Sequence, residues 1–88
     1  MSQRIATLSI LVADPEGAKA VNQLLHEAAP AVLGRMGLPR VAPGLSVICV
    51  VLAAPQEAIA TLSGRLGQLS GVSVTACYAK KVFDEPLR

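Results

Sequence analysis

Apolar side chains recur at every second position through residues 4–13, and this alternation predicts a β-strand. One face of the strand carries Ala6, Leu8, Ile10 and Val12. The other face carries Ile5, Thr7, Ser9 and Leu11. The first set is uniformly apolar and the second is mixed, so we expect the first set to face the core.

The spacing then changes to that of a helix. Asp14-Pro15-Glu16 combines a carboxylate N-cap, a proline in the first turn and a further acid near the positive end of the helix dipole. A stripe at i, i+3, i+4 and i+7 follows, made of Val21, Leu24, Leu25 and Ala28. The polar face carries Lys19, Asn22, Gln23, His26 and Glu27. Pro30 predicts that the helix ends at Ala28 or Ala29.

Two further extended segments follow. From Ala31 the pattern is extended but interrupted by glycines and a proline, which predicts an edge strand with a bulge or bend near Gly34 and Gly37. Pro43-Gly44 supplies the central residues of a type II turn. Residues 45–53 are apolar on both faces except at Ser46, which predicts a central strand with both faces covered.

The C-terminal third repeats the helix-to-strand order. A second helix is predicted from Pro55, with Ile59, Leu62 and Leu66 as its apolar stripe. Gly67 is the expected left-handed C-cap. A last strand is predicted over residues 72–79. We therefore expect one domain over residues 1–80 and a polar tail over residues 81–88.

The resulting order, βαββαβ, predicts an α+β ferredoxin-like fold. Right-handed crossovers give an antiparallel four-stranded sheet of order 4-1-3-2 with both helices on one face. In this sheet the first strand separates Cys49 from Cys77 by about 9–10 Å, beyond the reach of a disulfide. Both cysteines are expected to be free thiols.

Composition adds a reason to expect self-association. The chain has 88 residues, of which 52% are hydrophobic and 16% charged. A domain of this size buries only about 60–65% of the surface that its unfolded chain exposes, and little charge is available to cover the remainder. We therefore predict a homo-oligomer, a dimer or tetramer, that buries the sheet face left bare by the helices. The predicted interface residues are Thr7, Ser9, Leu11, Val47, Cys49 and Val51.

Several partner classes are disfavoured. A net charge of +2 is too small to indicate direct nucleic-acid binding, and the central strands lack the aromatic side chains on which bases stack. No run of about 18 apolar residues predicts a membrane span. The N-terminus enters a strand directly without the features of a signal peptide, so a cytoplasmic location is expected.

The sequence contains few residues arranged for catalysis or metal binding. No serine or cysteine stands in a recognisable motif with the single histidine, His26. No Cys-x-x-Cys pair or His/Cys cluster indicates a metal, and one histidine supplies one ligand where a site needs three or four. We expect no enzyme activity, no catalytic residue, no metal and no cofactor.

Five runs of the sequence carry a family resemblance: residues 25–27, 34–39, 46–48, 62–69 and 71–74. The most specific is Gly34-Arg35-Met36-Gly37-Leu38-Pro39. Together they resemble the iron-only hydrogenase system regulator family over nearly the whole chain, from Arg4 to about Lys80. The resemblance implies an ACT-like fold, similar to the effector domain of the nickel-responsive repressor. It also implies a cytoplasmic, self-associating module with a regulatory role.

Three hypotheses remain open. The first is an oligomeric regulatory module that binds a small effector beside the first helix and the second strand. Because no DNA-reading element is evident, control of transcription would require a partner regulator protein. The candidate effector-binding residues are His26, Gly34, Arg35, Met36, Gly37 and Pro39. The second is a structural oligomerisation or protein-interaction module without a ligand. The third is a small ferredoxin-fold enzyme with His26 at a subunit seam.

Overall fold

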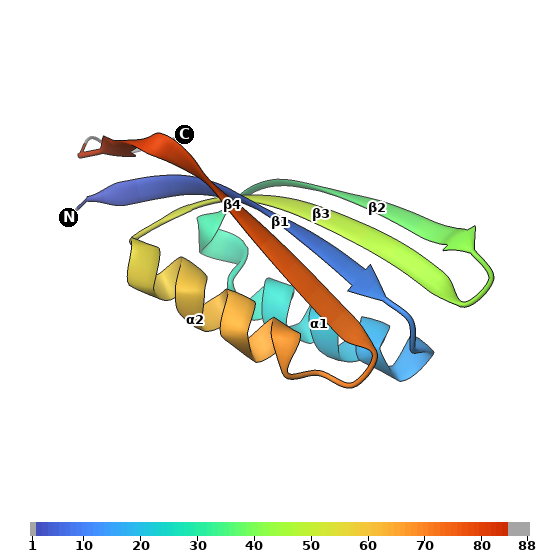
Figure 1. Ribbon diagram of the computed structural model, residues 1–88. Coiled ribbons are helices and arrows are strands. Elements are labelled where there is room, and N and C mark those ends of the chain that lie inside the picture. Colours follow the sequence, from blue (N-terminus) through green and yellow to red (C-terminus); the bar gives the residue numbers. More distant parts are fainter. Residues whose placement is uncertain (1, 85–88) are drawn as a thin grey trace.

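A computed structural model describes residues 2–84 as one layer of strands and one layer of helices (Figure 1). The elements, in chain order, are β1 (Gln3–Val12), α1 (Pro15–Glu27), the short 3₁₀ helix η1 (Ala29–Ala31), β2 (Val32–Ala42), β3 (Leu45–Ala54), α2 (Gln56–Gly67) and β4 (Val72–Phe83). The predicted βαββαβ order is confirmed. Pro30 lies within η1, where it separates α1 from β2.

The strands form one antiparallel sheet of order β2-β3-β1-β4. This is the predicted order read from the opposite edge. Figure 1 shows α1 and α2 side by side beneath the same face of the sheet. Ser9 pairs with Cys49 while Thr7 pairs with Cys77, so β1 lies between the cysteines. Both are free thiols, as predicted.

The core lies between the helices and the sheet. Leu8 and Ile10 of β1 and Val50 of β3 are completely buried. Val21 of α1 and Leu66 of α2 close over them from the helix layer. Each strand contributes alternate residues, because successive side chains point to opposite faces. The core side of β1 is therefore the one that its alternation predicts.

A tight corner holds the start of α1 against the start of β4. The Asp14 side chain accepts a hydrogen bond from the Glu16 N–H at 3.0 Å, the predicted N-cap. The Ala13 N–H donates to the Gly71 carbonyl at 2.7 Å. Gly71 has φ +73°, and a Cβ added there would lie 2.7 Å from the Asp14 Cβ. Only glycine fits this position without strain.

The last strand is longer than predicted. β4 was expected to end at Ala79, but it continues to Phe83, with Val82 opposite Arg4 and Phe83 opposite Gln3. The predicted polar tail from residue 81 therefore begins inside a strand. The pairing resumes past an irregularity near Arg4, whose guanidinium donates to the Ala79 carbonyl at 2.9 Å and lies 5.2 Å from the centre of the Tyr78 ring. The end of the predicted tail, residues 85–88, lies outside the described residues.

Two local predictions about glycine need correction or refinement. Gly67 was expected to be a left-handed cap, but it lies inside α2, and the cap residue Gln68 has right-handed helical geometry. The pairing of β2 with β3 shifts near Gly34, as predicted, and again between Leu38 and Ala42. In the second irregularity the left-handed residue is Arg40, with φ 57°.

Gly44 has φ +73° in the turn that joins β2 to β3, which fits its predicted place in a type II turn.

Candidate functional site

The alternation of β2 divides the predicted effector-binding residues between the two faces of the sheet. Met36 is paired with Cys49, which places both on the face without helices. Arg35 is paired with the buried residue Val50, on the helix side. Arg35 and Met36 are neighbours in sequence but cannot contact one ligand from the same side of the sheet.

On the helix side, Arg35 and His26 line the same hollow between α1 and β2. The Arg35 Nη2 donates to the Asn22 Oδ1 at 2.7 Å, which links the edge strand to the polar face of α1. The hollow has a volume of about 280 Å³. Its lining residues are Asn22, Leu25, His26, Ala29, Val32 and Arg35. We call this hollow the α1–β2 cleft.

The chemistry of the α1–β2 cleft favours an anion. No carboxylate lines it, and its two ionisable side chains, Arg35 and His26, are both bases. Asn22 orients the Arg35 guanidinium through one nitrogen, which leaves further N–H donors for a carboxylate or phosphate. Leu25 and Val32 provide apolar contact for the remainder of such a molecule.

The other predicted ligand residues lie elsewhere. A Cβ added at Gly34 or Gly37 would meet nothing within 4 Å, so no close approach within the described chain requires glycine there. Pro39 lines a separate hollow with Arg40, beside the start of α1. The six predicted residues therefore do not converge on one site, and only His26 and Arg35 share a cleft.

The sheet face without helices carries a continuous set of apolar and small polar side chains, which we call the open face. Rows across β2, β3 and β1 follow the register: Gly34–Val51–Thr7, Met36–Cys49–Ser9 and Leu38–Val47–Leu11. All six predicted interface residues lie in these rows. Leu11, Met36 and Leu38 are 36%, 55% and 46% exposed. The prediction that β3 has both faces covered therefore does not hold within the single chain, whose own helices cover only one.

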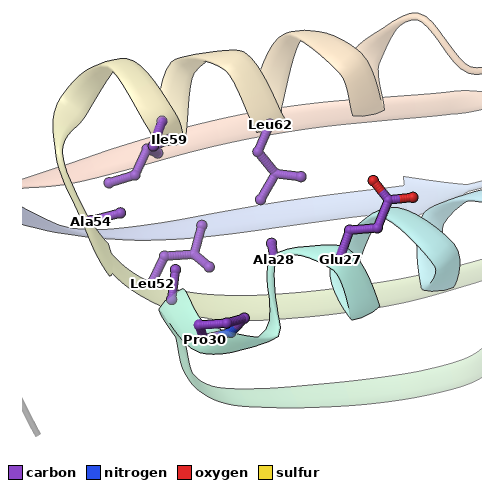
Figure 2. A pocket seen from close by; sticks show the side chains of 9 residues that line it. Glu27, Ala28, Pro30, Leu52, Ala54, Ile59 and Leu62 are labelled. Atoms are coloured by element: carbon purple, nitrogen blue, oxygen red, sulfur yellow. The ribbon is translucent and has the colours of Figure 1, made fainter.

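Sequence reasoning missed a third feature, a pocket between the two helices (Figure 2). Its volume is about 250 Å³. Leu52 and Ala54 of β3 lie at its base, Ala28 and Pro30 approach from the segment that follows α1, and Ile59 and Leu62 approach from α2. Glu27, Ala31 and Ala58 complete the lining. We call this hollow the interhelical pocket.

Small side chains keep the interhelical pocket open. Ala31, Ala54 and Ala58 come from η1, β3 and α2, and Ala28 lies between α1 and η1. An alanine cluster of this kind leaves no motif in the sequence, because alanine is also the strongest helix former. The one available signal is that the apolar stripe of α1 ends in Ala28 where a larger residue would fill the space.

Two further findings concern metal binding and membrane insertion. Within residues 2–84, no group of three or more histidine, cysteine, aspartate or glutamate side chains is arranged to hold a metal ion. Neither α1 nor α2 has the length and apolar character that a membrane-spanning helix needs.

Comparisons with known proteins give one family. The family model described as TM1266-like, a proposed iron-only hydrogenase system regulator, matches residues 4–76. The solved structure of the uncharacterized protein TM1266 from Thermotoga maritima is 37% identical, with a TM-score of 0.84, and the alignment covers 89% of this chain and 99% of that one. No curated protein sequence matches.

More distant structures share the fold alone. The C-terminal domain of the MgtC protein from Mycobacterium tuberculosis is 12% identical, with a TM-score of 0.70 and coverage of 93% of this chain and 94% of that one. The apo form of CPII, a nitrogen regulatory PII-like protein from Thiomonas intermedia K12, is 14% identical, with a TM-score of 0.58 and coverage of 94% and 97%. CPII has also been solved bound to ADP, AMP and bicarbonate.

Proposed function

The chain belongs to the TM1266-like family of proposed iron-only hydrogenase system regulators, and we propose that it is a regulatory module that associates with copies of itself and binds a small anionic effector. One observation carries the proposal: an apolar open face lies on one side of β2, and a basic cleft lies on the other.

The open face supports association with a second copy. Leu11, Met36 and Leu38 are large apolar side chains exposed on a flat sheet surface, and their removal from water favours association. The face carries no Asp, Glu, Lys or Arg in the three rows defined above, so a second copy meets it without burying an unpaired charge. Packed face to face, two sheets bury the same residues from each subunit.

The α1–β2 cleft supports an anionic effector. Its two basic side chains and its apolar floor suit a small carboxylate or phosphate ester. The ferredoxin-type fold is compatible with such a role, since CPII shares it and binds adenine nucleotides and bicarbonate.

The two surfaces are connected through β2. An anion held by Arg35 acts on the same strand that presents Met36 and Leu38 to the second copy. Binding would then favour one packing of the two subunits over another, by as much as the effector affinity differs between them. Control of transcription would pass through a partner regulator protein that contacts DNA.

The test of association replaces Leu11 and Val47 together by lysine, two neighbouring residues of the open face. We expect the self-association constant to fall at least about tenfold, because the charges would be buried on association. Size-exclusion chromatography with light scattering measures the change. The matched control replaces Ala60 and Thr61 together by lysine, which adds the same two charges at exposed positions of α2. A native chain that is monomeric at all concentrations would refute the proposal.

The test of effector binding screens carboxylates, inorganic phosphate and nucleotides by thermal shift. A ligand of the α1–β2 cleft should lose most of its stabilisation in Arg35→Met, which keeps the length of the side chain but removes its charge and donors. Arg40→Met is the control, because Arg40 is exposed on the same strand and lines a different hollow. Equal loss in both variants would indicate general charge attraction and count against the cleft.

A further inference from the structure

The interhelical pocket is formed where three segments far apart in sequence meet. The C-terminal end of α1 with η1 forms one side, the first turns of α2 form the other, and the end of β3 forms the base (Figure 2). Leu52 and Ile59 are each 1% exposed, so their side chains belong to the core. Ala28 and Ala58 stand at positions where longer side chains would close the space.

The size of the interhelical pocket suits a compact ligand. Its volume of about 250 Å³ is below that of typical drug-sized sites, which begin at about 300 Å³. It nevertheless exceeds an engineered apolar cavity of about 150 Å³ that binds benzene. A hydrocarbon group of about five carbons therefore fits by volume.

The negative charge of Glu27 at the rim indicates which polar group the ligand should carry. Glu27 is the one ionisable residue in the lining of the pocket, and Figure 2 shows its carboxylate directed toward the α2 layer, apart from the apolar side chains. Its existing partners are weak: Arg65 Nη1 is 3.6 Å from the Glu27 Oε1, and Gln23 Nε2 is 3.4 Å from the Oε2. A carboxylate can accept about four hydrogen bonds, so this one has unused capacity.

We propose that the interhelical pocket binds small organic ammonium ions, with the hydrocarbon group between Leu52, Ile59 and Leu62 and the ammonium group on the Glu27 carboxylate. The apolar contacts supply most of the binding free energy, and the charge supplies the selectivity. Arg65 lines the groove next to the pocket and not the pocket itself. Its guanidinium lies 3.6 Å from the Glu27 carboxylate, so a bound ammonium ion would compete with this exposed ion pair, which is weak.

This site is independent of the proposed effector site. His26 and Glu27 are successive residues of α1, and their side chains diverge by about 100° around the helix. His26 lines the basic α1–β2 cleft, whereas Glu27 is the one ionisable residue that lines the interhelical pocket. The two hollows thus prefer ligands of opposite charge, and either proposal can fail without the other.

The experiment titrates the intact protein with 3-methylbutylammonium and follows the methyl resonances of Leu52, Ile59 and Leu62 by NMR. The matched probes are 3-methylbutanoate and 3-methylbutan-1-ol, which keep the hydrocarbon group and change its charge. We expect saturable shifts with the ammonium ion, weaker binding of the alcohol and the weakest binding of the carboxylate. Equal affinity for all three probes would overturn the role of Glu27.

Two variants locate the site. Ala58→Leu should fill the pocket and abolish the saturable shifts, whereas Ala60→Leu makes the same change on α2 outside any of the hollows described above. Glu27→Gln should weaken ammonium binding about threefold to fivefold, the range for a half-exposed ion pair. Unchanged ammonium binding in Ala58→Leu, or no saturable shift in the native chain, would refute the proposal.

Discussion

The two faces of the sheet are built from the same strands and face opposite environments. On β3, Val50 is fully buried beneath the helices, and its neighbour Val51 is only half-buried on the open face. On β1 the same contrast separates Ile10 from Leu11. Side-chain type does not distinguish these positions. What distinguishes them is that α1 and α2 both cover the same face of the sheet and leave the other face uncovered.

The contrast between the two faces shows that the apolar surface not buried in the core of this small chain lies on the open face. The side chains of the covered face form the hydrophobic core of one subunit. The apolar side chains of the open face remain exposed to water in a monomer and add little to its core. Substitutions on the covered face should therefore change the free energy of unfolding of the single chain. Substitutions on the open face should change association instead. The following predictions test this division, starting with the largest effect.

Leu8→Ala should lower the free energy of unfolding by about 2–5 kcal/mol, because it leaves a cavity in the fully buried core. Leu11→Ala, three residues away on the open face, should lower it by about 1 kcal/mol or less in the monomer. Urea denaturation at a protein concentration that keeps the chain monomeric measures both. Similar losses in the two variants would mean that the open face is part of the folding core of one subunit.

The corner that holds α1 beneath the sheet gives the next effect. Gly71→Ala should destabilise the fold by about 1–3 kcal/mol, since alanine disfavours φ +73° and its Cβ would lie 2.7 Å from the Asp14 Cβ. Gly64→Ala is the matched control. Gly64 lies in α2 with nothing within 4 Å of an added Cβ, so alanine should stabilise the helix by about 0.5–1 kcal/mol. Thermal melts of the two variants should shift in opposite directions.

The smallest effect concerns accessibility and leaves stability unchanged. Cys77 is exposed on the open face of the single chain, opposite Thr7. Its alkylation should slow about tenfold as the protein concentration rises through the dissociation constant of the oligomer, because only the free subunit reacts. In the Leu11→Lys, Val47→Lys variant the rate should stay fast at every concentration. If the rate of Cys77 alkylation in the native chain does not depend on protein concentration, a second copy does not cover the open face.

Much of the fold was predictable because its signals are local and repeated. The alternation in β1, the Asp14 cap and the Pro43-Gly44 turn each specify their own element. Once the order of elements is known, the handedness of the crossovers leaves one sheet order. That order places Thr7, Val51 and their neighbours on the open face with no further information.

The unpredicted features depend on contacts between distant segments. The sequence predicts that the last strand ends at residue 79, yet pairing with Gln3 and Arg4 extends β4 to Phe83. Most of the candidate site residues are close together in sequence, whereas the pleat sends Arg35 and Met36 to opposite faces. The interhelical pocket is lined by four alanines from segments far apart in sequence, and no local pattern brings them together.

The irregular end of β2 has a consequence for the shape of any assembly. Pro39 lacks an N–H, and the left-handed Arg40 beside it turns the backbone away from a regular ladder. A border of this kind resists the addition of another strand, which is the step that leads to open-ended fibrils. The irregular β2 edge therefore disfavours assembly by strand addition in the plane of the sheet. Two sheets can still pack face to face, and an assembly of that kind is closed.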